Sequence, residues 1–159
     1  MRRAAALFAC ALLALAGCAP AGPPYDSVAA TIPSVPQGAA RIYFYRWLEP
    51  YETLAATPAM LNGTPVGVTR IGTIFYRDVA PGRYTISVRS QGLYPNQFKT
   101  VTIAAGQTMY VRIESLRTWV ICGGSVEGGS SSCGDTFTVE IIDPAVAQAE
   151  MSGLQFIHG

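Results

Sequence analysis

Between Ala40 and Ile142 the chain is a succession of short β-prone segments separated by turn signals. No other feature limits the possible folds as strongly. The segments are rich in β-branched and aromatic residues, and Asn62-Gly63 joins two of them with the dipeptide typical of a two-residue hairpin. Pro81-Gly82 and Ala105-Gly106 mark further turns. Strands at this spacing are typical of a β-sandwich.

Two segments show how the sheets should be buried. In residues 83–89 the apolar side chains alternate with polar ones, as expected for a half-buried antiparallel strand. Residues 41–47 carry large side chains on both faces, so we expect this strand to lie inside a sheet with both faces covered. The predicted strands are 41–47, 59–61, 65–68, 72–79, 83–89, 98–103, 109–114, 118–122 and 136–142.

The last strand is followed by a predicted helix. Asp143 has the side chain of an N-cap, and Pro144 suits the first helical position, so we expect a short helix over residues 145–151. Leu154, Phe156 and Ile157 should then dock on the sheet. The fold class is therefore all-β, an antiparallel β-sandwich of about 7–9 strands with a short C-terminal helix.

The start of the chain has the features of an export signal. Arg2 and Arg3 precede an apolar run that is too short for a permanent membrane-spanning helix, which needs about 20 residues. The run ends in Leu15-Ala16-Gly17-Cys18, which resembles the lipobox of bacterial lipoproteins. This resemblance implies cleavage before Cys18 and lipidation of Cys18. The alternative is an ordinary cleaved signal peptide, with Cys18 a plain cysteine.

The chain is thereby divided into a signal peptide (1–17), a lipid-anchored Pro-rich tether (18–38) and the sandwich domain with its C-terminal helix (39–159). Prolines favour extended backbone, so the tether is expected to hold the domain tens of ångströms above the membrane. Ala19 follows the cysteine where an aspartate would retain a lipoprotein in the inner membrane of enterobacteria-like cells. The expected location is the outer membrane, facing the periplasm.

The remaining cysteines fit an oxidising compartment. Cys10 would leave with the signal peptide and Cys18 would carry lipid, so Cys122 and Cys133 remain as a pair. We predict a disulfide between them, which would stabilise the fold by about 3 kcal/mol. Their spacing is not the CxxC of a redox motif, and no cluster of cysteine or histidine offers metal ligands.

Composition argues against several functions. Loss of the signal peptide removes Arg2 and Arg3 and leaves 9 basic against 10 acidic residues, so the basic footprint required for nucleic acid is missing. No cofactor or metal motif is present, and the Gly- and Ser-rich segment around residues 123–134 lacks the strand-to-helix context of a phosphate loop. The histidine, His158, stands next to the end of the chain, where fraying is expected.

The turn segments also carry a resemblance. Residues 60–67, 78–84 and 104–111 resemble a widespread, uncharacterised domain family of bacterial lipoproteins. They are also similar to PEGA and carboxypeptidase-regulatory-like domains, which implies a small sandwich used for display or adhesion. These motifs consist of turn residues, so they support the fold more than a function.

Two sets of residues are candidates for function. The aromatic residues Trp47, Tyr51 and Trp119 are a possible binding surface, although most of the tyrosines and tryptophans of the chain are expected to pack in the core. The carboxylates Asp78, Glu114 and Glu140 are the candidates for catalysis if two of them converge, and Glu114 and Glu140 could face each other across strands.

We therefore expect a lipid-anchored binding or scaffolding module of the cell envelope rather than an enzyme. Its partners would be the membrane, through lipid on Cys18, and another envelope protein or peptidoglycan. The alternatives are an envelope glycan hydrolase or a hydrolase inhibitor, and a purely structural stalk.

Overall fold

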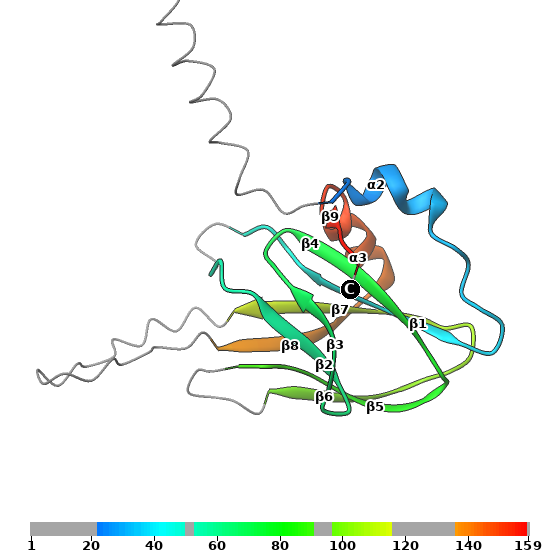
Figure 1. Ribbon diagram of the computed structural model, residues 1–159. Coiled ribbons are helices and arrows are strands. Elements are labelled where there is room, and N and C mark those ends of the chain that lie inside the picture. Colours follow the sequence, from blue (N-terminus) through cyan, green and yellow to red (C-terminus); the bar gives the residue numbers. More distant parts are fainter. Residues whose placement is uncertain (1–21, 50–52, 91–96, 116–135, 159) are drawn as a thin grey trace, which may run out of the picture.

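The structure is a computed structural model, and it describes residues 22–49, 53–90, 97–115 and 136–158. Within these residues, nine strands form two sheets that pack face to face (Figure 1). Sheet A has the order β8-β7-β1-β4-β9, and sheet B has the order β3-β2-β5-β6. The strands are β1 (Ala40–Arg46), β2 (Thr57–Leu61), β3 (Thr64–Thr69), β4 (Thr73–Val79), β5 (Gly82–Val88), β6 (Phe98–Ile103), β7 (Thr108–Ser115), β8 (Phe137–Ile142) and β9 (Gln155–Phe156).

The predicted all-β sandwich is confirmed, and two of its strand pairings are parallel. The chain leaves sheet A after β4, builds β5 and β6 into sheet B, and returns as β7 on the other side of β1. Strand β7 therefore runs parallel to β1, and β9 runs parallel to β4. The other pairings are antiparallel.

The main core lies between the two sheets. Phe44 and Phe75 stack with their ring centroids 5.3 Å apart in its centre. Ile86 and Val88 of β5 contribute from sheet B, as the alternation in this strand predicts. Gly67 of β3 leaves room for the Phe75 ring, because a Cβ at Gly67 would lie 2.5 Å from a ring carbon.

A second cluster covers the outer face of sheet A. Every residue of β1 is buried, which confirms that both faces of this strand are covered. Tyr43 and Tyr45 point away from the main core and pack under helix α3 (Pro144–Met151), whose Ala147 and Met151 are fully buried. Sheet A is therefore the middle layer of the molecule, with sheet B on one side and helices on the other (Figure 1).

The local signals at the hairpin and the helix are confirmed. Asn62 and Gly63 both have positive φ, 50° and 79°, as the predicted two-residue turn between β2 and β3 requires. The Asp143 side chain accepts a hydrogen bond from the Ala145 amide at 2.9 Å, and Pro144 opens helix α3. Leu154 is buried and Phe156 belongs to β9, so the segment after α3 docks on the sheet as expected.

The structure corrects the predicted tether from residue 22 onward. Residues Tyr25–Val28 form helix α2 and Ala29–Thr31 form the 3-10 helix η2. The Tyr25 ring packs edge-on against Tyr43, and Ile32 packs on the same outer cluster. The prolines favour extended backbone on either side of these two helices. Tyr25 and Ile32 nevertheless pack on sheet A, which composition alone does not predict.

Backbone hydrogen bonds hold this N-terminal segment to the end of the chain. The Tyr25 amide donates to the Leu154 carbonyl at 2.7 Å, and the Phe156 amide donates to the Pro23 carbonyl at 2.8 Å. Gly22 lies so close to Phe156 that a Cβ at Gly22 would stand 2.1 Å from the Phe156 carbonyl oxygen. Among the described residues, no helix is long and apolar enough to cross a membrane.

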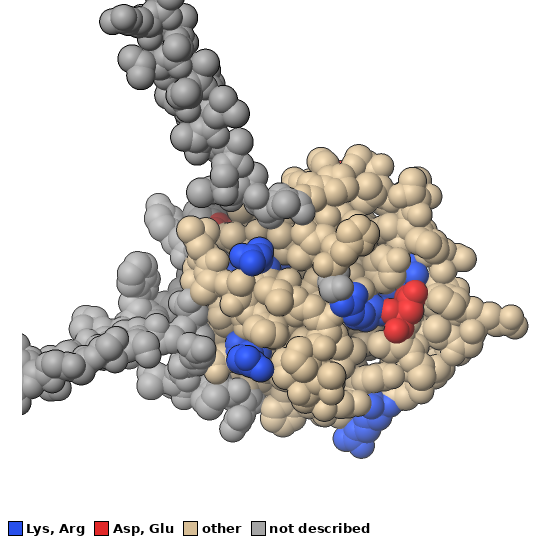
Figure 2. Space-filling model, in the orientation of Figure 1, with Lys and Arg blue, Asp and Glu red and all other residues tan. Residues whose placement is uncertain are grey.

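The surface carries few charges in the view of Figure 2, in agreement with a chain of which 13% is charged. The predicted strand 118–122 lies outside the described residues.

Candidate functional site

A shallow cleft lies where β1 ends beside helix α3, and we call it the Trp47 cleft. Its volume is about 530 Å³, within the range of ligand sites. Its walls come from the residue after β1 and from one side of the helix. The lining residues are Trp47, Ala145, Val146, Ala149, Glu150 and Ser152.

Trp47 supplies the aromatic side of the cleft. It follows Arg46, the last residue of β1, and is 41% exposed, whereas Tyr45, two residues earlier, is fully buried. Val146 on the helix is 50% exposed, and the alanines Ala145 and Ala149 also line the cleft. Exposed tryptophan beside aliphatic residues is characteristic of protein-binding surfaces.

Glu150 supplies the polar floor. Its side chain accepts a hydrogen bond from the buried Tyr45 hydroxyl at 2.6 Å and another from Arg112 Nη1 at 2.6 Å. Glu150 is 13% exposed and Arg112 is 17% exposed, so this ion pair is largely withdrawn from water. The carboxylate at the cleft is therefore fixed in position by two buried donors.

Arg112 also forms ion pairs with Glu114 and Glu140, two of the carboxylates that the sequence suggested as catalytic candidates. Its Nε lies 2.5 Å from Glu114, and its Nη2 lies 2.9 Å from Glu140. In the strand register Glu140 stands opposite Arg112, and Glu114 stands opposite Thr138. Glu114 and Glu140 thus do not face each other directly but share one arginine.

Burial and charge shape the protonation of this cluster. Burial is the main cause that raises the pKa of Tyr45, and the hydrogen bond to Glu150 raises it further. Burial alone would lower the pKa of Arg112, but its carboxylate neighbours outweigh that effect and raise it. Tyr45 therefore stays a neutral donor, and three carboxylates against one guanidinium leave the cluster at a formal charge of −2.

The third catalytic candidate lies elsewhere. Asp78 of β4 accepts two hydrogen bonds from Arg41, at 2.7 and 2.8 Å, and Arg41 stacks over the Tyr76 ring. Arg41 also donates to the carbonyl of Pro33, which ties the N-terminal segment to the sheet. Asp78 thus anchors Arg41 and does not join Glu114 and Glu140.

The other predicted site residues lie outside the described residues. They are the lipidation candidate Cys18, the disulfide candidates Cys122 and Cys133, and the aromatic candidates Tyr51 and Trp119. His158 is described and was expected to fray. Instead its exposed ring stands edge-on to Phe156, with centroids 5.9 Å apart.

Glu150 is the functional candidate that sequence reasoning missed. A hint was available, because Glu150 stands three residues after Ala147 and one before Met151, the two buried residues of helix α3. A carboxylate so near the buried side of a short helix requires a polar partner on the sheet. No group of three metal-ligating side chains occurs in the part of the chain that the structure describes.

No curated protein and no solved structure matches the chain. A family model described as "Protein of unknown function (DUF2846)" matches residues 36–125, more than half of the chain. This range includes β1 to β7 and Trp47, whereas β8, helix α3 and β9 lie beyond it. The chain belongs to the DUF2846 family.

Proposed function

We propose that the protein is a lipid-anchored binding module of the cell envelope whose Trp47 cleft receives a segment of a partner protein. The observation that carries the proposal is the 41% exposed Trp47 beside helix α3, above a fixed and negatively charged floor. An apolar side chain of the partner would pack between Trp47 and Val146. A neighbouring lysine or arginine would meet Glu150 and the excess negative charge around Arg112.

The anchor part of the proposal rests on the sequence Leu15-Ala16-Gly17-Cys18. Several acyl chains on Cys18 would hold the protein on the membrane almost permanently. The docked N-terminal segment supports a short connection, since only four residue steps separate Cys18 from Gly22, a span of at most about 14 Å. The domain would lie close to the membrane surface, with the outer membrane and its periplasmic side as the proposed place.

The similarity to PEGA domains and the predicted Cys122–Cys133 disulfide agree with an exported display module. The alternative of a glycan hydrolase gains no support from the glutamates. Both Glu114 and Glu140 are engaged by Arg112, and a hydrolase needs one of its two carboxyl groups available as an acid.

Photo-cross-linking in intact cells tests the binding site. A photoreactive amino acid replaces Val146 at the Trp47 cleft or, as the matched control, Thr100 on the outer face of sheet B. We expect one discrete adduct from position 146 and none from position 100, and we expect Trp47→Ala to reduce that adduct at least fivefold. Equal adducts from both positions, or none from either, would overturn the binding proposal. An adduct with peptidoglycan instead of a protein would reassign the partner.

Membrane fractionation tests the anchor separately. Cys18→Ser is expected to move the protein from the membrane pellet to the soluble fraction after a carbonate wash. A protein that remains in the pellet with this substitution would contradict lipidation at Cys18.

A further inference from the structure

The edge of strand β4 is only partly covered by β9. Within the described residues, β9 pairs with Thr73 and Ile74 and ends at Phe156. The Ile157 amide donates to the Ile74 carbonyl at 2.9 Å, so this carbonyl points to the β9 side. Carbonyls two residues apart point the same way along a strand, so the Tyr76 carbonyl also points to this edge.

Arg77 lies at the uncovered part of the edge. Its Nη1 donates to the Tyr76 carbonyl at 3.1 Å, which places the guanidinium where β9 no longer pairs. A guanidinium has five N–H donors, and this contact uses one of them. Within the part of the chain that the structure describes, no carboxylate pairs with Arg77, and the neighbouring Asp78 is taken by Arg41.

A pocket of about 560 Å³ opens at the same place, and we call it the edge pocket. Its volume is within the range typical of small-molecule sites. Among the described residues, the lining combines the cation Arg77 with apolar and aromatic side chains and contains no carboxylate. The lining includes Thr31, Ile32, Tyr76, Arg77, Phe156 and His158.

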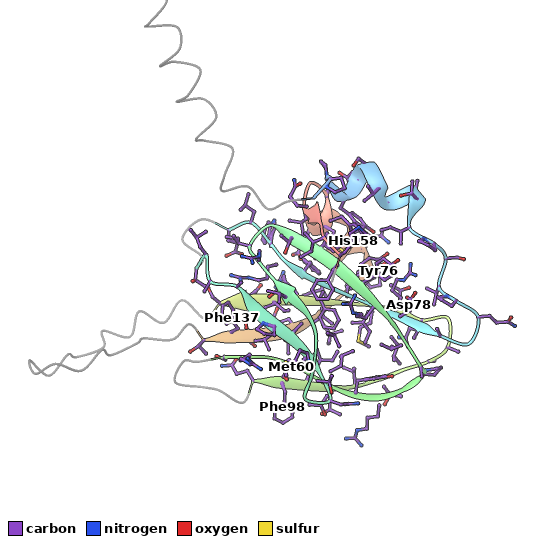
Figure 3. All side chains as sticks on the ribbon, viewed as in Figure 1. Met60, Tyr76, Asp78, Phe98, Phe137 and His158 are labelled. Atoms are coloured by element: carbon purple, nitrogen blue, oxygen red, sulfur yellow. The ribbon has the colours of Figure 1, made fainter. Side chains whose placement is uncertain are left out.

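Aromatic rings form one wall of the edge pocket. The centroids of Tyr76 and Phe156 are 6.0 Å apart, and those of Phe156 and His158 are 5.9 Å apart. Figure 3 shows Tyr76 of β4 and His158, which follows β9, near each other in the view, and both line the edge pocket. Ile32 faces them from the docked N-terminal segment. A flat apolar group fits such a wall, since aromatic rings gain from stacked or edge-on contact.

We infer that the edge pocket binds an organic anion with a flat apolar body, such as an aromatic carboxylate. The ring of the ligand lies against Tyr76 and Phe156, and its carboxylate meets Arg77, whose planar guanidinium matches a carboxylate with two parallel hydrogen bonds. This site is distinct from the Trp47 cleft, with which it shares no lining residue.

Calorimetric titration of the full chain carrying Cys18→Ser tests the inference without competing lipid or detergent. The probes are naphthalene-2-carboxylate and its neutral counterpart naphthalene-2-methanol. We expect saturable binding of the carboxylate and at least tenfold weaker binding of the alcohol. Arg77→Gln should weaken carboxylate binding at least tenfold, whereas the matched control Arg83→Gln, an exposed arginine of β5, should leave it within twofold.

Thr31→Trp provides a second variant, because Thr31 is an exposed lining residue whose enlargement would fill the edge pocket. It should abolish binding while the melting temperature stays near that of the parent chain. Equal binding of the acid and the alcohol, equal loss with Arg83→Gln, or no binding at all would overturn the inference. In the last case Arg77 would only protect the edge of β4 from pairing with another chain. Arg77→Gln and Thr31→Trp leave Trp47 unchanged. A titration result that contradicts the edge-pocket inference therefore does not affect the cross-linking test of the Trp47 cleft.

Discussion

Trp47 directly follows the end of β1 and stands two residues after Tyr45, yet Tyr45 is fully buried and Trp47 is 41% exposed. Helix α3 covers Tyr45, and its Glu150 accepts the Tyr45 hydroxyl, whereas β1 ends before Trp47. Alternation along the strand predicts on which face of the sheet each residue lies. It does not predict how far helix α3 extends over that face. Glu150 escaped prediction for the same reason, because its position depends on how α3 crosses the sheet.

Alanine at position 47 should separate a surface residue from a core residue. We expect Trp47→Ala to lower the free energy of unfolding by less than about 1.5 kcal/mol, because much of its surface is already in water. Phe44→Ala, at a fully buried position, should cost about 3–5 kcal/mol. Chemical denaturation measures both. A loss at Trp47 as large as that at Phe44 would place Trp47 in the core.

Arg112 should be important for stability, because it pairs with three carboxylates. Arg112→Ala leaves three nearby carboxylates without their cation, and we expect a loss of about 2–4 kcal/mol at pH 7. Thermal unfolding of the parent chain and the variant at pH 7 measures the effect. An Arg112→Ala variant as stable as the parent chain would contradict it.

At the scale of elements, local chemistry made most of the strands predictable. The Asn62-Gly63 turn, the alternation in β5 and the Asp143 cap each act within a few residues, and each is confirmed. The parallel neighbours β1 and β7 depend on the path through sheet B, which no local signal encodes. The docking of α2 and η2 depends likewise on a surface built by distant residues.

Gly22→Ala should release the N-terminal segment. A Cβ at Gly22 would stand 2.1 Å from the Phe156 carbonyl oxygen, so the segment must move away from β9. We expect faster hydrogen exchange at the Tyr25 amide, which donates to Leu154, while the amides of β5 keep their protection. Ser34→Ala, an exposed position of the same segment, is the control. Unchanged exchange at Tyr25 would show that this contact does not hold the segment.

At the scale of the whole molecule, stability should fall in alkali. Burial raises the pKa of Tyr45 and, together with Tyr43, that of Tyr25. The unfolded chain releases these phenolic protons near the ordinary pKa of about 10, and the folded chain retains them, so unfolding becomes more favourable above that pH. Denaturant unfolding between pH 8 and 11 measures the slope, which Tyr45→Phe should reduce. An equal slope in Tyr45→Phe would contradict the role of Tyr45.

The meeting of the two ends of the chain has a consequence for biosynthesis. Ser152 donates to the Asp26 carboxylate across 126 positions, and the Phe156 amide reaches the Pro23 carbonyl. A chain that emerges N-terminus first cannot make these contacts until residues 152–156 have emerged. Contacts of such long range also make folding slow. The outer layer of sheet A is therefore completed late in biosynthesis, and until then the tyrosines of β1 remain without their cover.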